Sequence, residues 1–353
     1  MSVHIQMKKN SPYLMFLKAI EFSLHQDMDP LKFSDEIFQC VHFSKDQCLE
    51  LFQYQSQAVP IYRSFIDALG IQPSKVRDMH QIPFLPIEFF KSHNVLSESS
   101  TPQLWFTSSG TSGSEVSRHG VSHPKVYTRS FRQAFQNALK PAKGTAILGL
   151  LPSYLEREGS SLVYMVDQLI RDSGEEDSGF FLHNQDELLQ LLQQREHAQK
   201  PSILIGVTYA LLDFAERFPT PLRHTTIMET GGMKGRRKEL IREEVHGLLK
   251  EAFQVHQIAS EYGMTELLSQ AYALSDGLFT CPPWMKVLVR DSTDPLQVSP
   301  SGKGALNIID LANISSCAFL ATSDIGIVYP NGTFEVQGRL DHADIRGCNL
   351  LVA

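Results

Sequence analysis

Residues 107–114, with the sequence TSSGTSGS, combine the hydroxyl groups and the backbone freedom that a phosphate-binding loop needs. A turn of glycine and small hydroxyl residues leaves its backbone N–H groups uncovered, and these can form a concave nest that binds anions. Gly110 and Gly113 permit positive φ and a close approach of the backbone. No Gly-Lys-Ser or Gly-Lys-Thr follows, so the stretch is not a Walker loop, and a Ser/Gly linker is the alternative interpretation. The residues concerned are Thr107, Ser108, Ser109, Gly110, Thr111, Ser112, Gly113 and Ser114.

Residues 261–266, with the sequence EYGMTE, form a second candidate site after a predicted strand. The aromatic ring of Tyr262 beside Gly263 can stack on a flat heterocycle. The carboxylate of Glu266 can bind a hard divalent cation that bridges phosphates. The same residue types also suit the N-terminus of a helix, with Thr265 near the cap and Glu266 favoured by the helix dipole. The sequence leaves both interpretations open.

Three further side chains that could bind a ligand or react lie towards the C-terminal end of the sequence. Asp324, at a turn predicted between two strands, can accept hydrogen bonds from the hydroxyls of a ribose, or can form an ordinary Asx turn. Arg339 offers a cation to ribose or phosphate, or else forms a surface salt bridge. Cys348 can act as a nucleophile assisted by the nearby cation of Arg346, or can pack as a small hydrophobic residue.

Composition and charge narrow the class of protein. With 353 residues, 42% of them hydrophobic, the chain has the length of about two domains and enough apolar mass for a core. The net charge of −7 argues against nucleic acid or an anionic membrane as the main partner. The five cysteines have irregular spacing and no CxxC, so we expect a cytoplasmic protein with free thiols. We find no signal peptide, membrane-spanning run, HExxH or G-x-S-x-G motif.

The elements that must position these residues fall into three regions. Residues 1–80 carry apolar side chains at helical spacing and predict a helical region packed on the core. Residues 81–285 alternate strand, loop and helix, which is typical of an α/β fold. Residues 286–353 predict a β-rich subdomain of short strands, followed by a short tail.

Within these regions the chemistry-bearing turns follow strands. Ligands of α/β sheets bind outside the carboxyl ends of the strands, and the glycine-rich turns at 107–114 and 229–235 both fall at predicted strand ends. A helix is predicted over residues 236–253. In the β-rich subdomain, residues 331–332 (Asn-Gly) predict the turn of a hairpin.

Six motifs occur in an order that resembles the adenylate-forming superfamily of acyl-CoA synthetases, peptide-synthetase adenylation domains and luciferases. Within that superfamily, the chain most resembles the acyl-protein synthetases of the bacterial bioluminescence operon, because of the sequence FKSHNVLS before the loop, Arg-His-Gly at 118–120 and Cys348. The resemblance covers about residues 80–350 and implies sheets flanked by helices, a β-rich C-terminal subdomain and no mobile C-terminal lid domain. The motifs are residues 106–113, 230–232, 262–266, 302–308, 322–324 and 338–341.

The resemblance implies ATP and Mg²⁺ as cofactors. The loop of residues 107–114 would hold the β- and γ-phosphates of ATP. Gly263, Met264 and Thr265 would contact the nucleotide, with Thr265 at the α-phosphate. Glu266 would hold Mg²⁺, and Thr265 and Glu266 would both be catalytic.

The same resemblance implies the remaining contacts to the nucleotide. Gly231 and Gly232 would line the adenine and acyl pocket, and Tyr262 would stack near the adenine. Asp324 would bind the ribose hydroxyls, and Arg339 would contact ribose or phosphate.

The implied reaction is the attack of a fatty-acid carboxylate, expected to be long-chain, on the α-phosphorus of ATP, which gives acyl-AMP and pyrophosphate. The acyl group would then pass to Cys348 as the catalytic nucleophile, and on to a partner acyl reductase. Most members of the superfamily continue beyond the Gly-Arg-x-Asp motif as a lid with a catalytic lysine, whereas this sequence stops at Ala353. A lidless ligase that delivers the acyl group to CoA or a carrier protein is one alternative. A non-catalytic protein that binds nucleotide or a reductase is the other.

Overall fold

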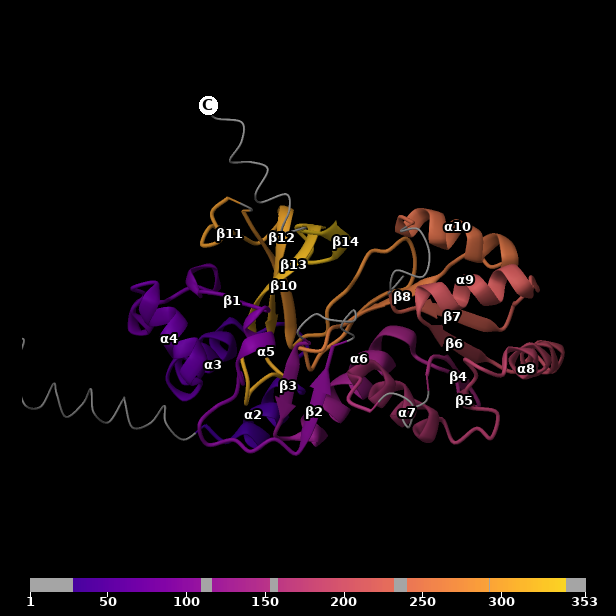
Figure 1. Cartoon of the computed structure of the whole chain (residues 1–353), viewed down its shortest axis with the longest axis horizontal. Helices are drawn as coiled ribbons and strands as arrows, with labels where there is room; N and C mark the ends of the chain where they lie inside the picture. The colour runs from indigo at the N-terminus through magenta and orange to yellow at the C-terminus, as the bar shows by residue number, and fades with distance from the viewer. Residues whose placement is uncertain (1–27, 109–115, 153–157, 232–239, 292, 341–353) are drawn as a thin grey trace, which may run out of the picture.

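The structure is a computed structural model, and its described residues form two six-stranded sheets and a short hairpin between groups of helices (Figure 1). Several residues predicted to be functional, from Ser109 to Ser114 together with Gly232 and Cys348, lie outside the described part of the chain. The described residues are 28–108, 116–152, 158–231, 240–291 and 293–340.

The first sheet of the α/β fold has the order β5-β4-β6-β7-β8-β9, and all its neighbours pair in parallel except β8 and β9. Every residue of β4 and β6 is buried, as expected for central parallel strands that are covered on both faces. The strands are β4 (Ala146–Leu150), β5 (Gly179–Phe180), β6 (Ser202–Gly206), β7 (Thr225–Glu229), β8 (Ala259–Tyr262) and β9 (Ala271–Ala273).

Helices flank this sheet, with α9 and α10 on one side and α6 and α7 on the other (Figure 1). Ser160 caps α7 by accepting a hydrogen bond from the backbone of Val163, and Gly174 ends the helix in the left-handed conformation. The helix expected from residue 236 is shorter than predicted, because residues 240 and 241 are not helical and the Glu244 side chain caps the start. The helices are α6 (Pro124–Leu139), α7 (Ser161–Ser173), α8 (Gln185–His197), α9 (Thr208–Arg217) and α10 (Arg242–Phe253).

The second sheet contains the β-rich C-terminal part of the chain and has the order β1-β13-β12-β10-β11, with β14 also paired to β13. The predicted hairpin is confirmed, because Val328 pairs with Phe334 and Gly332 in the turn has a φ of 85°. β1 pairs in parallel with β13, so a segment from early in the chain completes the late sheet. The strands are β1 (Leu85–Pro86), β10 (Met285–Arg290), β11 (Val298–Ser299), β12 (Gly302–Asp310), β13 (Phe319–Val328) and β14 (Phe334–Arg339).

The N-terminal helices lie beside this second sheet, as the indigo and yellow segments of Figure 1 show. The buried side chain of Gln55 in α3 donates to the carbonyls of Asn313 and Ile314 and accepts from the backbone N–H of Ala318. This side chain therefore fixes the loop between β12 and β13. The helices are α2 (Pro30–Ile37), α3 (Lys45–Ala58), α4 (Pro60–Ala68), α5 (Phe89–Ser92) and the 3₁₀ turns Pro73–Lys75 and Met79–Gln81.

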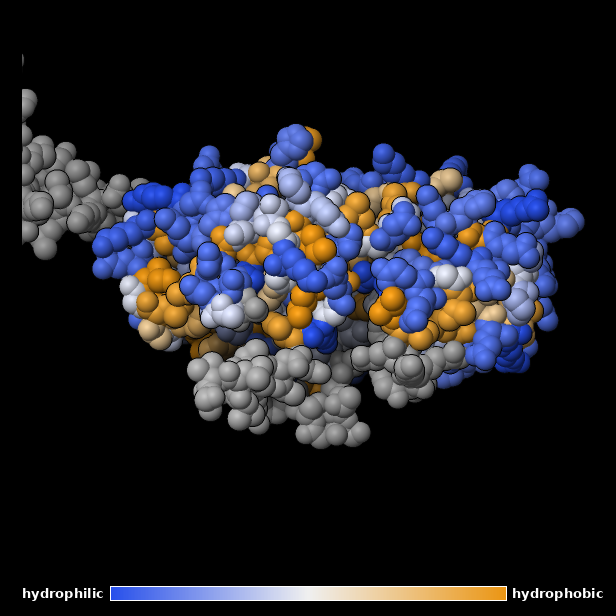
Figure 2. All heavy atoms as spheres, turned by 90° about the horizontal axis from the view of Figure 1, so that it is seen from above, coloured by the Kyte–Doolittle hydropathy of each residue, from blue (hydrophilic) through white to orange (hydrophobic). Residues whose placement is uncertain are grey.

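The surface mixes hydrophilic side chains with separate hydrophobic patches on the face that Figure 2 shows. None of the helices in the described residues is both long enough and apolar enough to cross a membrane.

Candidate active site

A short hairpin of β2 (Leu104–Thr107) and β3 (Arg118–Val121) carries the two ends of the predicted phosphate-binding loop. The backbone N–H of Ser108 donates to the carbonyl of Ser117 (N–O 3.0 Å), and the N–H of Ser117 donates to Oγ of Ser108 (2.9 Å). The backbone N–H of Thr107 donates to the carbonyl of Gly159 (2.7 Å). The base of the loop is therefore fixed in position, and Thr107 lines a pocket.

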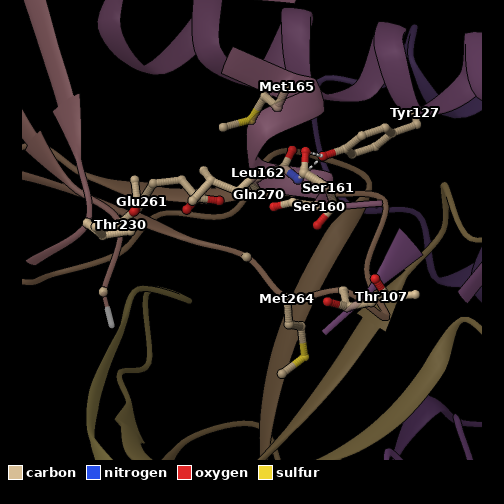
Figure 3. A pocket seen from close by; sticks show the side chains of 14 residues that line it. Thr107, Tyr127, Ser160, Ser161, Leu162, Met165, Thr230, Glu261, Met264 and Gln270 are labelled. Carbon is tan, nitrogen blue, oxygen red and sulfur yellow. Dashed lines mark hydrogen bonds between the residues drawn. The ribbon is translucent and has the colours of Figure 1, made fainter. Parts of the chain in front are cut away.

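This pocket, which we call the site pocket, has a volume of about 190 Å³. Val207, Thr230 and Gly263 each follow the last residue of β6, β7 or β8, so the pocket lies at the carboxyl ends of three parallel strands. In Figure 3, Glu261 and Thr230 approach it from the left, and Ser161 and Tyr127 from the right. It is lined by Thr107, Tyr127, Ser160, Ser161, Leu162, Met165, Val207, Thr230, Gly231, Glu261, Gly263, Met264, Thr265 and Gln270.

The turn after β7 is held by the buried carboxylate of Glu229. This carboxylate accepts hydrogen bonds from the backbone N–H of Gly231 (2.8 Å) and the hydroxyl of Thr208 (3.1 Å). Burial alone would raise the pKa of Glu229, but its interaction with His246 and the charge of Arg242 outweigh burial and lower the pKa to about 2. The ionised carboxylate thus keeps Gly231, whose φ is 70°, at the wall of the site pocket.

The turn after β8 carries Thr265 and Glu266. It continues from strand into an irregular turn, so the interpretation of these residues as a helix N-terminus is wrong. His119 in β3 contacts the carbonyl oxygen of Thr265 through Nδ1 (2.9 Å) and Oδ1 of Asn313 through Nε2 (3.1 Å). The Nδ2 amide of Asn313 donates to the carbonyl of Glu266 (2.8 Å). His119 and Asn313 therefore clamp the backbone of the two residues predicted to be catalytic.

The carboxyl group of Glu266 is buried, and this burial raises its pKa, although Ser117 and the charges of Arg339 and Lys91 act in the opposite direction. The described residues contain no group of three or more acidic, His or Cys side chains that could hold a metal. Mg²⁺ is commonly bound by one or two carboxylates together with substrate phosphates and water. A single carboxylate at Glu266 fits that mode of binding.

Tyr262, Asp324 and Arg339 form one hydrogen-bonded group. The Tyr262 hydroxyl donates to Oδ2 of Asp324 (2.7 Å), and Nε of Arg339 donates to Oδ1 (2.9 Å). Asp324 lies within β13 and pairs in register with Arg339 of β14, so its predicted position at a turn is wrong. The hairpin at 331–332 sets the register, and a bulge between Ile325 and Gly326 shifts it by one residue so that Asp324 and Arg339 oppose each other. Arg339 does form a salt bridge, and its side chain is 73% exposed and can reach a ligand.

Two polar residues at the site pocket have no role in the sequence analysis. Burial, and next the negative charge of Glu229, raise the pKa of Glu261 to about 8. An ideal Cβ atom at Gly263 would lie 2.4 Å from Oε1 of Glu261 and 3.3 Å from Cγ of Gln270, so these two side chains meet over the glycine. Oε1 of Gln270 is buried without a hydrogen-bond partner. Their burial at the sheet end is a tertiary property that local pattern does not reveal.

Two solved structures show the same fold at low sequence identity. The chain superposes on 2-hydroxyisobutyryl-CoA ligase in complex with 2-HIB-AMP and CoA with a TM-score of 0.63, at 13% identity, over 90% of this chain and 70% of that one. It superposes on ATP-bound MatB from Rhodopseudomonas palustris with a TM-score of 0.51, at 17% identity, over 67% of this chain. The match spans about half of MatB (47% of that chain). The fold is that of the adenylate-forming enzymes.

Comparison of the sequence with known proteins shows the family to which the chain belongs. Residues 20–353 match the family described as acyl-protein synthetase, LuxE, and the chain belongs to that family of ligases. A long-chain-fatty-acid–luciferin-component ligase of Vibrio harveyi is 26% identical over 327 residues, which are 85% of this chain and 84% of that protein. The ligase of the same description from Aliivibrio fischeri is 29% identical over 139 residues, which are 36% of this chain and 37% of that protein.

Proposed function

We propose that this protein activates a long-chain fatty acid with ATP to acyl-AMP and pyrophosphate, and passes the acyl group to Cys348 and then to a partner acyl reductase. The observation that carries the activation step is that Thr107 and Thr265 line the site pocket at the carboxyl ends of the strands, while Tyr262, the last residue of β8, hydrogen-bonds to Asp324 of the Asp324–Arg339 pair. Family membership and the names of the two relatives support the fatty acid as substrate.

In this proposal, the fatty-acid carboxylate attacks the α-phosphorus and pyrophosphate leaves. The step needs neutralisation of negative charge rather than a covalent residue. Thr265 supplies a hydroxyl at the wall of the site pocket, and Arg339 supplies a cation whose charge acts on Glu266 against the larger effect of burial on its pKa. Mg²⁺ at Glu266 would stabilise charge on the phosphate oxygens. The clamp of His119 and Asn313 keeps Thr265 and Glu266 in position for this work.

Ribose binding is assigned to the second sheet. Asp324 presents a carboxylate that already accepts two hydrogen bonds, from Tyr262 and Arg339. A pair of ribose hydroxyls can take the place of one such donor. Stacking of adenine near Tyr262, and the contacts predicted for Gly231, Gly263 and Met264, belong to the same proposal.

The acyl transfer requires a thiolate that attacks the carbonyl carbon of acyl-AMP, so that a thioester forms and AMP leaves. Three described cysteines are poorly suited to this step. Burial raises the pKa of the thiols of Cys48, Cys281 and Cys317 to about 12 in each case, which disfavours the thiolate. This leaves the partly exposed Cys40 and Cys348, which lies outside the described residues, and the proposal takes Cys348 as the acceptor.

The direct test is carboxylate-dependent exchange of labelled pyrophosphate into ATP, measured with a panel of fatty and aromatic acids. We expect exchange with fatty acids and weak exchange with aromatic ones. No exchange with any acid would contradict the proposal. Formation of free acyl-CoA by a Cys348→Ser variant would instead support transfer to CoA. The reductase partner and the cytoplasmic location stay predictions.

A further inference from the structure

A second cavity lies next to the site pocket at the β9 edge of the first sheet, beside α6. It has a volume of about 790 Å³, and its walls come from the C-terminal half of α6 and from residues 272–283. We call it the outer groove. Large hydrophobic side chains open onto it, among them Leu274 and Leu278, which are 50% and 39% exposed. Ala138, Leu139 and Pro282 complete an apolar lining.

One side chain, Gln270, is shared by the walls of the site pocket and the outer groove. Its amide is weakly held. The Nε2 group lies 3.5 Å from the Tyr127 hydroxyl, at the long limit of a hydrogen bond, and the buried Oε1 atom has no partner. A change of rotamer therefore breaks only this long hydrogen bond and gives Oε1 the chance of a partner. We therefore expect the Gln270 side chain, which lies between the two cavities, to be able to change rotamer.

The sizes and linings of the two cavities differ in a way that suits the two ends of an amphipathic molecule. Binding sites for ligands of drug size are typically about 300–1,000 Å³. The site pocket, at about 190 Å³, falls below that range, and Thr107, Glu261 and Thr265 give it a polar wall. The outer groove, at about 790 Å³, falls within the range and is mainly apolar. A carboxyl group fits the first cavity, and a long alkyl chain fits only the second.

We propose that the outer groove binds the alkyl tail of the acyl substrate, and that Gln270 swings aside to let the tail pass between the two cavities. This inference rests on the proposed function, because it takes a fatty acid as the substrate. It adds a location for the tail and a residue that controls access to it. A protein partner and a second copy of this chain are the other candidate occupants of the outer groove, and the experiments below distinguish them.

The first experiment measures kcat/KM for pyrophosphate exchange as a function of fatty-acid chain length. Each methylene buried in the outer groove contributes about 4-fold, from the transfer free energy of a methylene. We expect kcat/KM to rise with chain length in the unmodified protein. Leu274→Glu and Leu278→Glu should flatten that rise for long acids and leave the shortest acids unchanged. The matched control is Leu296→Glu, which alters an equally exposed leucine (51% exposed) away from the groove.

The second experiment locates the tail directly. A fatty acid with a photoreactive diazirine at its methyl end is bound in the presence of ATP, irradiated, and mapped by peptide mass spectrometry. We expect cross-links to residues 272–283 and to the end of α6, and we expect Ala138→Trp to remove them by filling the groove. Cross-links confined to other segments would overturn the inference.

The outcomes separate the possibilities. If no acid supports exchange in the unmodified protein, the proposed function fails. If exchange is normal but the length profile of the Leu274 and Leu278 variants matches that of Leu296→Glu, only the outer-groove inference fails. If these variants instead dissociate a dimer in light scattering, or lose a reductase while keeping the length profile, the groove binds a second copy or a protein partner, and the inference is overturned.

Discussion

The imidazole of His119 contacts the backbone of Thr265, with Nδ1 2.9 Å from the carbonyl oxygen, across 146 positions of the chain. Burial lowers the pKa of His119 to about 4, even though its contacts with Thr265 and Asn313 act in the opposite direction. The ring is therefore neutral at pH 7 and carries one N–H, so it donates one hydrogen bond, either to the Thr265 carbonyl or to Oδ1 of Asn313, and holds the turn without charge. This gives β3 a part in positioning the turn after β8.

We expect His119→Phe to lower kcat for pyrophosphate exchange about 10- to 100-fold, because a buried group left without its partner costs about 1–3 kcal/mol. The KM for ATP should change little, since the imidazole contacts the backbone of Thr265 and not Asp324, the residue proposed to bind the ribose. Steady-state pyrophosphate-exchange kinetics give kcat and KM, and circular dichroism checks that the variant is folded. His123→Phe, on the same segment, is the control, and an unchanged kcat in His119→Phe would show that the clamp is dispensable.

We expect the free energy of unfolding to depend on pH through the protonation of Glu261. Because burial and then Glu229 raise its pKa to about 8, the folded protein keeps a proton there that the unfolded chain releases near its ordinary value of 4.5. The stabilisation is fully present below about pH 4.5 and is lost as pH rises towards 8. This group alone contributes a slope of up to about −1.4 kcal/mol per pH unit in that window. The neighbouring tyrosines, Tyr127 and Tyr272, stay neutral throughout, because burial raises their pKa well above 10.

Urea unfolding at several values between pH 5 and 8.5 measures this slope. We expect Glu261→Gln to make the curve flatter and to be more stable than the unmodified protein at pH 8.5. Glu251→Gln, which changes an exposed residue of α10, should keep the original slope. Equal slopes in all three proteins would rule out a protonated Glu261.

The role of Asp324 in ribose binding is tested by its substitution and by that of its hydrogen-bond partner Tyr262. We expect Asp324→Asn to raise the KM for ATP about 10- to 100-fold, since hydrogen bonds to a charged group are worth about 1.5–3 kcal/mol. Tyr262→Phe removes one neutral donor and should raise it less than about 10-fold. KM is measured at saturating fatty acid, with Asp291→Asn as an exposed control. An Asp324→Asn protein with normal KM would remove Asp324 from the ribose site.

Cys348 is tested by covalent labelling. Incubation with ATP and radiolabelled fatty acid should give a hydroxylamine-sensitive label in the unmodified protein and in Cys40→Ser, whose free thiol is partly exposed. Cys348→Ser should lose the label and keep pyrophosphate exchange, because the activation step does not use the thiol. Full labelling of Cys348→Ser would assign the acyl acceptor to another residue.

Much of the fold follows from local pattern. The central strands β4 and β6 are mainly apolar (AILGL and SILIG), and the glycine-rich turn at Gly231 follows the end of the next parallel strand, β7. The Asn331-Gly332 pair predicts its hairpin because the turn needs one residue with a positive φ, which glycine adopts without strain, and Gly332 has a φ of 85°.

The parts that the sequence did not reveal depend on distant contacts. Asp324 resembles a turn residue locally, but pairing with β14 places it within a strand. The link between His119 and Asn313 joins positions 194 residues apart, and a lone histidine gives no local signal of such a contact. The role of Glu261 depends on burial beside Glu229, which only the assembled sheet creates.

The pairing of β1 with β13 also constrains the order of folding. Leu85 pairs with Leu320, so β1 leaves the ribosome long before its partner strand has been made. At synthesis rates of about 5–20 residues per second, the delay is on the order of ten to fifty seconds. During that time the early helices lack the sheet that covers them, and their apolar faces are available to chaperones. Completion of β13 is therefore required before β1 can take its place in the second sheet.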